Sequence, residues 1–253
     1  MAVQRIKLLG VPVDVCSKQD LEEKILQLLE KKGPSQISFI TIWDFMKIRC
    51  KNEYAESIRN ADLILPISKS ILSGAKFLNK TVPFRYNPFD AFISILSILE
   101  SRYKSFYIFG GRKKALAAAE KNMRSTFRGL QIVGRCVGYY QKQDEENIIQ
   151  AISKASPSLV LVSEGIKKKD FWSYSNKEKF SSGIFLYYRD AVGILSKRIK
   201  RVNPKVFEKG HEVWGEIIRN PLRIFLIFPF SVCFLSGQNF LKRIRGFCQG
   251  REF

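Results

Sequence analysis

The chain has 253 residues, of which 45% are hydrophobic and 13% aromatic, so it can form a full core and is not a disordered protein. The length fits one large α/β domain or one domain with an appendage. The chain has 43 Lys and Arg residues against 23 Asp and Glu, a formal net charge of +20. This charge favours a polyanionic partner: nucleic acid, an anionic membrane surface or a phosphate-bearing substrate.

The cysteines and histidines limit the chemistry that the chain can support. The five cysteines form no CxxC pair, and His211 is the single histidine. We therefore expect no protein-bound metal, and no motif indicates another cofactor. The odd cysteine count indicates free thiols in a reducing compartment. Residues 1–15 contain no long apolar segment, so a secretory signal is not expected.

Short apolar runs alternate with amphipathic stretches as far as residue 195. The apolar runs predict buried strands, and the amphipathic stretches predict helices. In chain order they predict a helix starting at Ser17, strands at 36–42 and 62–65, a helix at 89–103, a strand at 105–109, a helix at 112–127, a strand at 130–133, a helix at 145–155, a strand at 159–162, a helix at 168–179 and a strand at 183–187. This alternation predicts an α/β fold: a Rossmann-like, mostly parallel sheet with helices on both faces.

The composition changes near Ser196, so we expect a core over residues 1–195 and an appendage over 196–253. The appendage carries 12 Lys and Arg against 4 Asp and Glu. Its apolar run at 224–235 contains Pro229 and is too short to span a bilayer. Apolar side chains with basic flanks predict peripheral association with an anionic membrane surface, the alternative being a helix packed on the core or a subunit interface. No nucleic-acid-binding motif accompanies the charge, so we expect no nucleic acid partner.

A glycine pair follows the predicted strand at 105–109. Gly110 and Gly111 would allow the backbone to approach a ligand closely. The helix that begins after Arg112 would direct free N–H groups and a partial positive charge at a phosphate. The alternative is a plain strand-to-helix turn.

Two further segments are candidates for anion binding. Arg85 precedes a predicted helix and is suited either to clamping a diphosphate through two hydrogen bonds or to contact with solvent. Asn87 and Pro88 predict the start of that helix, which gives Asp90 in its first turn a structural role beside any chemical one. The basic segment 164–170 is either a lid over an anion or a solvated helix start.

Considered together, several segments resemble the bacterial TagA/WecG/CpsF glycosyltransferase family. The matching segments are LGVPVD at 9–14, NADLILP at 60–66, the loop and helix start at 83–92, FGG at 109–111, VG at 133–134, GYY at 138–140, KR at 200–201 and NP at 220–221. They occur in the family's order and cover nearly the whole chain.

The resemblance implies a Rossmann-like core with a C-terminal appendage that works at the membrane. It implies an inverting transferase without a protein-bound metal. Such a protein transfers N-acetylmannosamine, or a related hexose, from a UDP-sugar to a polyprenyl-diphosphate-linked N-acetylglucosamine. The products feed teichoic acid, enterobacterial common antigen or capsule assembly. The implied location is cytoplasmic, on the inner face of the cell membrane, and members of the family can form oligomers.

The resemblance also implies a set of site residues. It implies substrate binding by Thr41, Arg85, Gly110, Gly111, Tyr139, Lys168, Lys169 and Arg223. The family's general base is an Asp directly after the proline of the NADLILP strand, but here Ile67 follows Pro66. Since isoleucine cannot accept a proton, we predict that Asp90 or Asp190 is the base. The alternative is a non-catalytic relative that binds a nucleotide-sugar or a lipid diphosphate and acts as a partner subunit.

Overall fold

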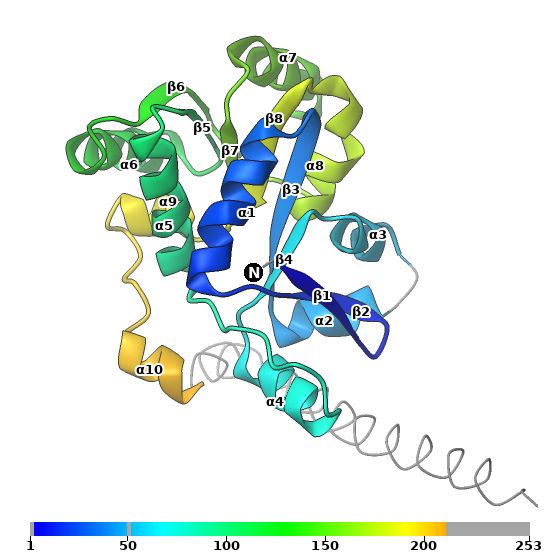
Figure 1. The fold of residues 1–253 in the computed structure, drawn as a ribbon. Helices are drawn as coiled ribbons and strands as arrows, with labels where there is room; N and C mark the ends of the chain where they lie inside the picture. The colour runs from blue at the N-terminus through cyan, green and yellow to red at the C-terminus, as the bar shows by residue number, and fades with distance from the viewer. Residues whose placement is uncertain (1–2, 50–51, 211–253) are drawn as a thin grey trace, which may run out of the picture.

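The structure is a computed structural model, and it describes residues 3–49 and 52–210. Its centre is a six-stranded, entirely parallel sheet with strand order β4-β3-β8-β7-β5-β6 (Figure 1). The strands are β3 (Gly33–Ile40), β4 (Leu63–Pro66), β5 (Ser105–Phe109), β6 (Gln131–Cys136), β7 (Leu159–Val162) and β8 (Ser182–Tyr187). The predicted α/β class, with its six parallel strands, is confirmed.

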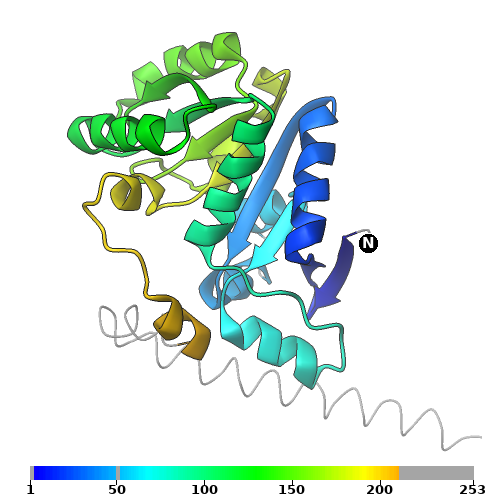
Figure 2. The ribbon, with the colours of Figure 1, turned by 60° about the vertical axis from the view of Figure 1, so that its left-hand side comes forward.

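Helices cover both faces of this sheet. One face carries α1 (Lys18–Glu30), α5 (Pro88–Ser101), α6 (Lys113–Thr126) and α9 (Ala191–Leu195). The other carries α2 (Ile42–Ile48), α3 (Glu53–Arg59), α7 (Glu145–Ala155) and α8 (Asp170–Ser175). Helices α4 (Lys69–Phe77) and α10 (Pro204–Lys209) lie at one end of the molecule (Figures 1 and 2).

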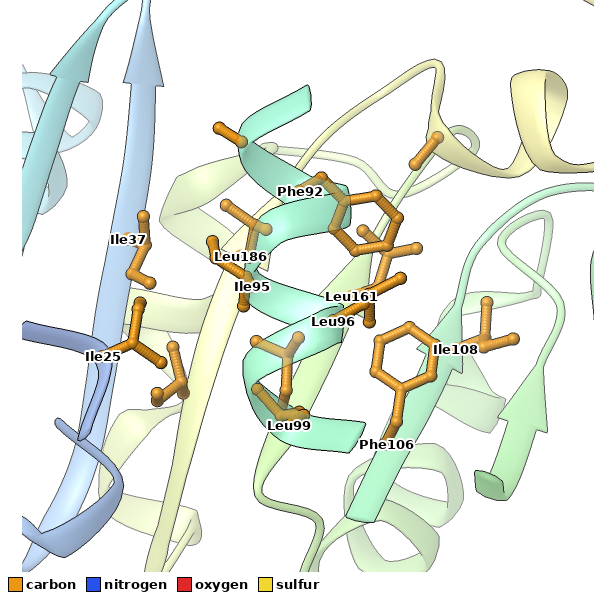
Figure 3. Close-up of a cluster of buried hydrophobic side chains, with 14 of the residues drawn as sticks. Ile25, Ile37, Phe92, Ile95, Leu96, Leu99, Phe106, Ile108, Leu161 and Leu186 are labelled. Carbon is orange, nitrogen blue, oxygen red and sulfur yellow. The ribbon is translucent and has the colours of Figure 1, made fainter. Parts of the chain in front are cut away.

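Strands β4, β5, β7 and β8 are buried on both faces along most of their length, which explains why their sequences are continuous apolar runs rather than alternating ones. In β7, Leu159 and Leu161 point into the cluster beneath α1 and α5, whereas Val160 and Val162 point into the cluster beneath α7 and α8. Figure 3 shows the first cluster, where Phe92 and Ile95 of α5 lie against side chains of the central strands. This packing holds the strand ends, and hence the loops that follow them, in fixed positions.

A two-stranded antiparallel hairpin, β1 (Gln4–Leu8) and β2 (Val11–Val15), precedes the sheet. Neither this hairpin nor helices α2, α3, α4, α9 and α10 were predicted from the sequence. The buried Asp14 carboxylate fixes the hairpin: it accepts from Arg5 at 2.7 Å and from the Ile64 backbone of β4 at 2.7 Å. The hairpin is therefore a structural addition at the β4 side of the sheet.

Two predicted boundaries were wrong for identifiable reasons. The strand predicted at 36–42 ends at Ile40, because Thr41 caps α2 through a reciprocal pair of hydrogen bonds with Asp44. The helix predicted at 168–179 is a short α8 followed by a 3-10 turn, η2 (Lys177–Lys179). Lys168 and Lys169 both have positive φ angles, 68° and 49°, which exclude them from a helix.

Candidate functional site

The structure brings most of the predicted site residues to one edge of the sheet. They lie in loops directly after the strands: Thr41 after β3, Gly110 and Gly111 after β5, Tyr139 after β6, Lys168 and Lys169 after β7, and Asp190 after β8. Arg85 reaches the same edge, where its Nε donates to the carbonyl of Ile67 after β4 at 2.9 Å. Ligands of open parallel sheets bind outside these carboxyl ends. Arg223 and residues 211–253 lie outside the described residues.

The glycine pair after β5 is packed against neighbouring loops. The N–H of Gly110 donates to the carbonyl of Cys136 at 2.9 Å, and that of Gly111 donates to the carbonyl of Glu164 at 2.7 Å. A Cβ on Gly110 would lie 2.8 Å from Ser163, and one on Gly111 would lie 2.6 Å from Val192. The two backbone donors are thus committed to protein carbonyls.

Two more glycines complete this packing. The Gly138 N–H donates to the carbonyl of Gly111 at 3.0 Å, and a Cβ there would lie 2.2 Å from the Glu164 carbonyl oxygen. A Cβ on Gly165 would lie 2.9 Å from the Gly138 backbone. We call Gly110, Gly111, Gly138 and Gly165 the glycine cluster: it joins the loops that follow β5, β6 and β7.

The outer rim of the glycine cluster is basic and aromatic. Tyr139 is 57% exposed, and the guanidinium of Arg112 lies 5.6 Å from the centre of its ring. Lys113 and Lys114 are also exposed. They lie in the first turn of α6, and this turn contains no acidic residue. Anion binding by this rim stays a prediction.

A cavity of about 500 Å³ opens at the same edge, on the face of the sheet that α2 and α3 cover. It lies between these two helices and the loop after β7. It is lined by Lys47, Asn52, Glu53, Tyr54, Lys168, Lys169 and Phe171, and we call it the lysine cavity. Its loop holds Lys168 and Lys169 in the left-handed region, a conformation that costs non-glycine residues energy and is common at ligand sites. The Lys168 ammonium lies 5.1 Å from the centre of the Phe171 ring.

A carboxylate lies behind the wall of the lysine cavity. Asp44 accepts from the Tyr54 hydroxyl at 3.0 Å and from the Thr41 hydroxyl at 2.6 Å. Burial raises the pKa of the Tyr54 phenol, so this group stays a donor at neutral pH. The Thr41 hydroxyl therefore caps α2 and is held by Asp44 at the edge where the resemblance implies substrate binding.

A second carboxyl group lies buried directly after Lys169. Asp170 accepts from the Ser38 hydroxyl at 2.9 Å, and Ser38 in turn accepts from the Gln36 amide at 3.1 Å. Burial raises the pKa of Asp170 to about 7, an effect that the Ser38 hydrogen bond partly offsets. The lysine cavity thus has a protonatable group behind its most basic wall.

Ile67, where the resemblance expects a catalytic Asp, lies directly after β4. Its N–H donates to the carbonyl of Ile40 at 3.0 Å, and its side chain packs partly buried against the main core. The Ser68 hydroxyl accepts from the Ile42 N–H at 3.0 Å, which joins this position to the start of α2. Through this contact, the segment that carries Asp44 borders the position of the missing carboxylate.

Arg85 and Asp90 line a second cavity, of about 590 Å³, between α1, α5 and α10. Arg85 donates to the carbonyl of Phe207 at 2.5 Å, and its guanidinium lies 3.7 Å from the centre of the Phe207 ring. Asp90 forms an ion pair with Arg201. These contacts hold the beginning of the predicted appendage against the core, and we call this space the Arg85 cavity.

Asp190 stands apart from both cavities. It occupies the N-cap position of α9, makes no capping hydrogen bond with its side chain and is exposed. Its neighbours Tyr187 and Tyr188 are phenols whose pKa is raised, mainly by their burial and further by the Asp190 charge. A role as base stays a prediction.

Sequence reasoning missed three residues of the lysine cavity region. The spacing of Thr41 and Asp44 is that of a helix-capping pair, so the contact between these two residues could have been predicted from the sequence. Tyr54 carried no such signal, because it reaches the cavity from α3. Asp170 gave no sign of burial, because it follows three lysines in the sequence.

The fold and site define a doubly wound α/β protein with a cationic crevice at the carboxyl edge of its sheet. A model of the WecG/TagA/CpsF family of glycosyl transferases matches residues 6–244, and the chain belongs to this family.

The chain is also similar to two proteins named N-acetylglucosaminyldiphosphoundecaprenol N-acetyl-beta-D-mannosaminyltransferase. That of Bacillus spizizenii is 24% identical over 171 residues, covering 67% of this chain and 65% of the relative. That of Bacillus subtilis is 20% identical over 211 residues, covering 83% and 78%. The first alignment thus spans just under two thirds of that relative's length.

Among residues 3–49 and 52–210, no helix is long and apolar enough to cross a membrane. Within the same ranges, no group of three or more His, Cys, Asp and Glu side chains is arranged to hold a metal ion.

Proposed function

We propose that this protein is an inverting glycosyltransferase of cell-surface polysaccharide synthesis, acting at the inner face of the cell membrane. It transfers a hexose of the N-acetylmannosamine type from a UDP-sugar to a polyprenyl-diphosphate-linked N-acetylglucosamine. Family membership and the names of the two relatives support the acceptor and the sugar. The observation that carries the donor assignment is the lysine cavity at the carboxyl edge of the sheet.

The lysine cavity has the size and chemistry for a nucleoside diphosphate. Its volume of about 500 Å³ falls within the usual range for small-molecule sites. Lys168 and Lys169 supply positive charge for the two phosphates, a role for which lysine is well suited. The rings of Tyr54 and Phe171 offer flat apolar surfaces for a pyrimidine base.

The Arg85 cavity suits the acceptor side of the reaction. It opens beside α10, where the predicted membrane-associating appendage begins. Arg85 and Lys18 supply positive charge, while Phe84 and Phe207 supply apolar surface. A lipid-linked diphosphate requires both, so we assign the acceptor to this side, with Arg223 of the appendage as a further proposed contact.

The transfer is a single displacement. The acceptor hydroxyl oxygen forms a bond to the anomeric carbon as the bond from that carbon to the β-phosphate oxygen breaks. The electron pair leaves with UDP, and the hydroxyl proton passes to a protein carboxylate. We propose Asp90 or Asp190 for this base, and the structure adds Asp44, whose helix α2 begins at the Ile42 N–H that binds Ser68, the residue after Ile67.

The direct test is release of UDP from UDP-N-acetylmannosamine in the presence of a polyprenyl-diphosphate-linked N-acetylglucosamine. The Lys168→Ala/Lys169→Ala double variant should lower kcat/KM for the donor by about 10²–10⁴-fold, since each charge-assisted contact contributes about 1.5–3 kcal/mol. The Lys113→Ala/Lys114→Ala double variant, which removes the same charge from the first turn of α6, is the control. No UDP release across a panel of UDP-hexoses would contradict the transferase proposal.

Single Asp→Asn variants at residues 44, 90 and 190 then identify the base. Loss of a general base lowers kcat by about 10²–10⁴-fold. We expect one of the three to show this loss while donor affinity stays within about twofold. Normal turnover in all three would exclude these carboxylates as the base.

The alternative is a non-catalytic relative that binds a nucleotide-sugar or lipid diphosphate as a partner subunit. Ile67 favours it, because no carboxylate stands at the position that the family uses for its base. Calorimetry separates the two hypotheses: saturable UDP binding with no turnover on any acceptor supports the binding relative, and turnover excludes it.

A further inference from the structure

Exposed apolar side chains gather on α4, on the loop after it and at α10. Of the eight large apolar side chains that are exposed among the described residues, five lie there: Phe77, Val82, Phe84, Val202 and Val206. Val82 is 45% exposed, Phe84 41% and Val206 41%. Water-facing apolar side chains in one region mark an interaction surface, whereas scattered ones do not.

These elements form one continuous region. The Lys69 ammonium of α4 donates to the carbonyl of Lys209 at 3.4 Å, and a Cβ on Gly210 would lie 2.8 Å from the Lys69 side chain. Figures 1 and 2 both show α4 and α10 at the same end of the molecule, beyond the carboxyl ends of β3 and β4. We call this region the α4–α10 surface.

The charge of this surface is strongly one-sided. Residues 63–89 contain four basic residues and no acidic one, and residues 196–210 contain six basic residues and one acidic residue, Glu208. Its exposed lysines are Lys69, Lys76, Lys80, Lys205 and Lys209. The apolar side chains are therefore set among positive charges.

We propose that the α4–α10 surface docks the folded core on an anionic lipid bilayer. Val82, Phe84 and Val206 enter the headgroup region, and the surrounding lysines lie over lipid phosphates. The surface joins α4 and the loop after it, which belong to the core, to α10, which lies in the first part of the predicted appendage, and it does not depend on residues 211–253. The docking rests on the proposed function only for its purpose, which is to bring the core to a lipid-linked acceptor.

The pattern of side chains favours a bilayer over other occupants. A second copy of this chain, paired through the same surface, would bring lysines against lysines. A polyanion without apolar groups would leave the valines and Phe84 in water. An anionic bilayer matches both the lysines and the apolar side chains, since it offers phosphate charge at its surface and apolar chains beneath it.

The position of the surface also fits the acceptor. Phe84, Arg85 and Phe207 line the Arg85 cavity, and Phe84 belongs to the α4–α10 surface as well. A core docked in this way opens that cavity at the depth of the lipid headgroups. A diphosphate carried on a lipid then reaches Arg85 without leaving the membrane interface.

The first test compares binding of the full chain to vesicles with 30% anionic lipid, measured without any sugar substrate. The Val82→Ser/Phe84→Ser variant should lower the partition coefficient by about tenfold. The matched control is Tyr103→Ser/Val133→Ser, which removes one aromatic and one aliphatic side chain exposed elsewhere, and it should stay within twofold. Equal binding by the first variant and the wild type would overturn the proposal.

The second test asks what covers the surface. Phe84→Trp and Tyr103→Trp are each measured against the wild type on vesicles that contain brominated lipid. Quenching of the residue 84 signal but not of the residue 103 signal supports docking. Absence of quenching at residue 84, whether because another part of the chain or a second copy covers it, would overturn docking.

A third measurement separates this proposal from the transferase proposal. The Val82→Ser/Val206→Ser variant, whose two side chains do not line the Arg85 cavity, should weaken vesicle binding, keep turnover within about twofold on a short-chain, water-soluble acceptor and lose it only on the vesicle-bound one. Weak vesicle binding with normal turnover on both acceptors would overturn docking alone. Absence of turnover in the wild type, with vesicle binding intact, would contradict the transferase proposal alone.

Discussion

The glycine cluster and the lysine cavity lie on the same edge of one sheet but are built in different ways. In the glycine cluster, backbone N–H groups bind backbone carbonyls of neighbouring loops, and space for a Cβ is already filled. In the lysine cavity, side chains from α2, α3 and the loop after β7 surround about 500 Å³ of open space. The first region fixes the loops, and the second leaves room for a ligand.

This contrast shows how one sequence signal has two structural meanings. A glycine pair between a strand and a helix allows either a ligand or another loop to approach the backbone. Here the loop after β7 makes that approach, because Gly111 donates to the carbonyl of Glu164 at 2.7 Å. The same loop then turns at Lys168 and Lys169 into the lysine cavity, so the closed region positions the open one.

Filling the glycine cluster should have the largest effect on stability. A Cβ at Gly138 would lie 2.2 Å from the Glu164 backbone oxygen, so Gly138→Ala should lower the free energy of unfolding by about 3 kcal/mol. Urea denaturation measures this loss. Gly129→Ala is the control: its nearest contact, at 3.1 Å, is the flexible Glu100 side chain, so its change should stay below about 1 kcal/mol. Similar losses in both variants would remove the argument for interlocked loops.

The buried Asp170 carboxyl should make the lysine cavity region pH-sensitive. Its folded-state pKa, about 7, lies above the ordinary 3.8, so the folded protein holds this proton more tightly than the unfolded chain does. The contribution to stability is therefore complete below about pH 4 and is lost as the pH rises to about 7.

The variant Asp170→Asn stays neutral throughout this range. Its unfolding free energy relative to the wild type should rise between pH 4 and pH 7 by about 3 kcal/mol. Chemical denaturation at a series of pH values measures the difference. A difference that does not change with pH would mean that the Asp170 carboxyl titrates as an exposed one does.

Substitutions at Thr41 should show whether its hydroxyl only caps α2 or also binds the donor. Thr41→Ala removes the hydroxyl that caps α2 and should cost about 1 kcal/mol of stability. Thr41→Ser keeps the hydroxyl and should restore both stability and donor affinity. If Thr41→Ala alters stability but leaves UDP affinity unchanged, the hydroxyl only caps the helix and does not bind the donor.

The ion pair of Asp90 with Arg201 should have the smallest effect on stability. Both side chains are more than 40% exposed, so a double-mutant cycle should give a coupling energy below about 1 kcal/mol. Asp90→Asn then tests catalysis without a confounding loss of fold. A coupling above about 2 kcal/mol would instead make Asp90 a structural residue of the α10 contact.

The sequence carried enough signal for the sheet but not for its surroundings. Strands buried on both faces are continuous apolar runs, so β4, β5, β7 and β8 were clearly visible, including Leu159–Val162 of β7 with its bounds as observed. Helix α2 was missed because it follows β3 after a single residue and the apolar character of the strand runs on into it. The end of β3 was misplaced for this reason, since Ile42 extends the run beyond the cap at Thr41.

The site was predictable as an edge but not as a cavity. Loops after parallel strands must meet at one edge, so strand ends alone brought Thr41, Gly110 and Lys168 together. The lysine cavity also depends on Tyr54, which lies more than 100 positions before Lys168 in the chain. No local sequence pattern predicts that these two residues line the same cavity. The occupied N–H groups of the glycine pair were equally hidden, because their partners lie in other loops.

Calorimetric titration of UDP into matched variants tests most directly the claim that the donor diphosphate binds in the lysine cavity. We expect Lys169→Ala to weaken UDP binding by about tenfold or more and Lys113→Ala to change it by less than about twofold. The opposite ranking, or an affinity for UDP that neither variant changes, would place the diphosphate outside the lysine cavity and contradict the account.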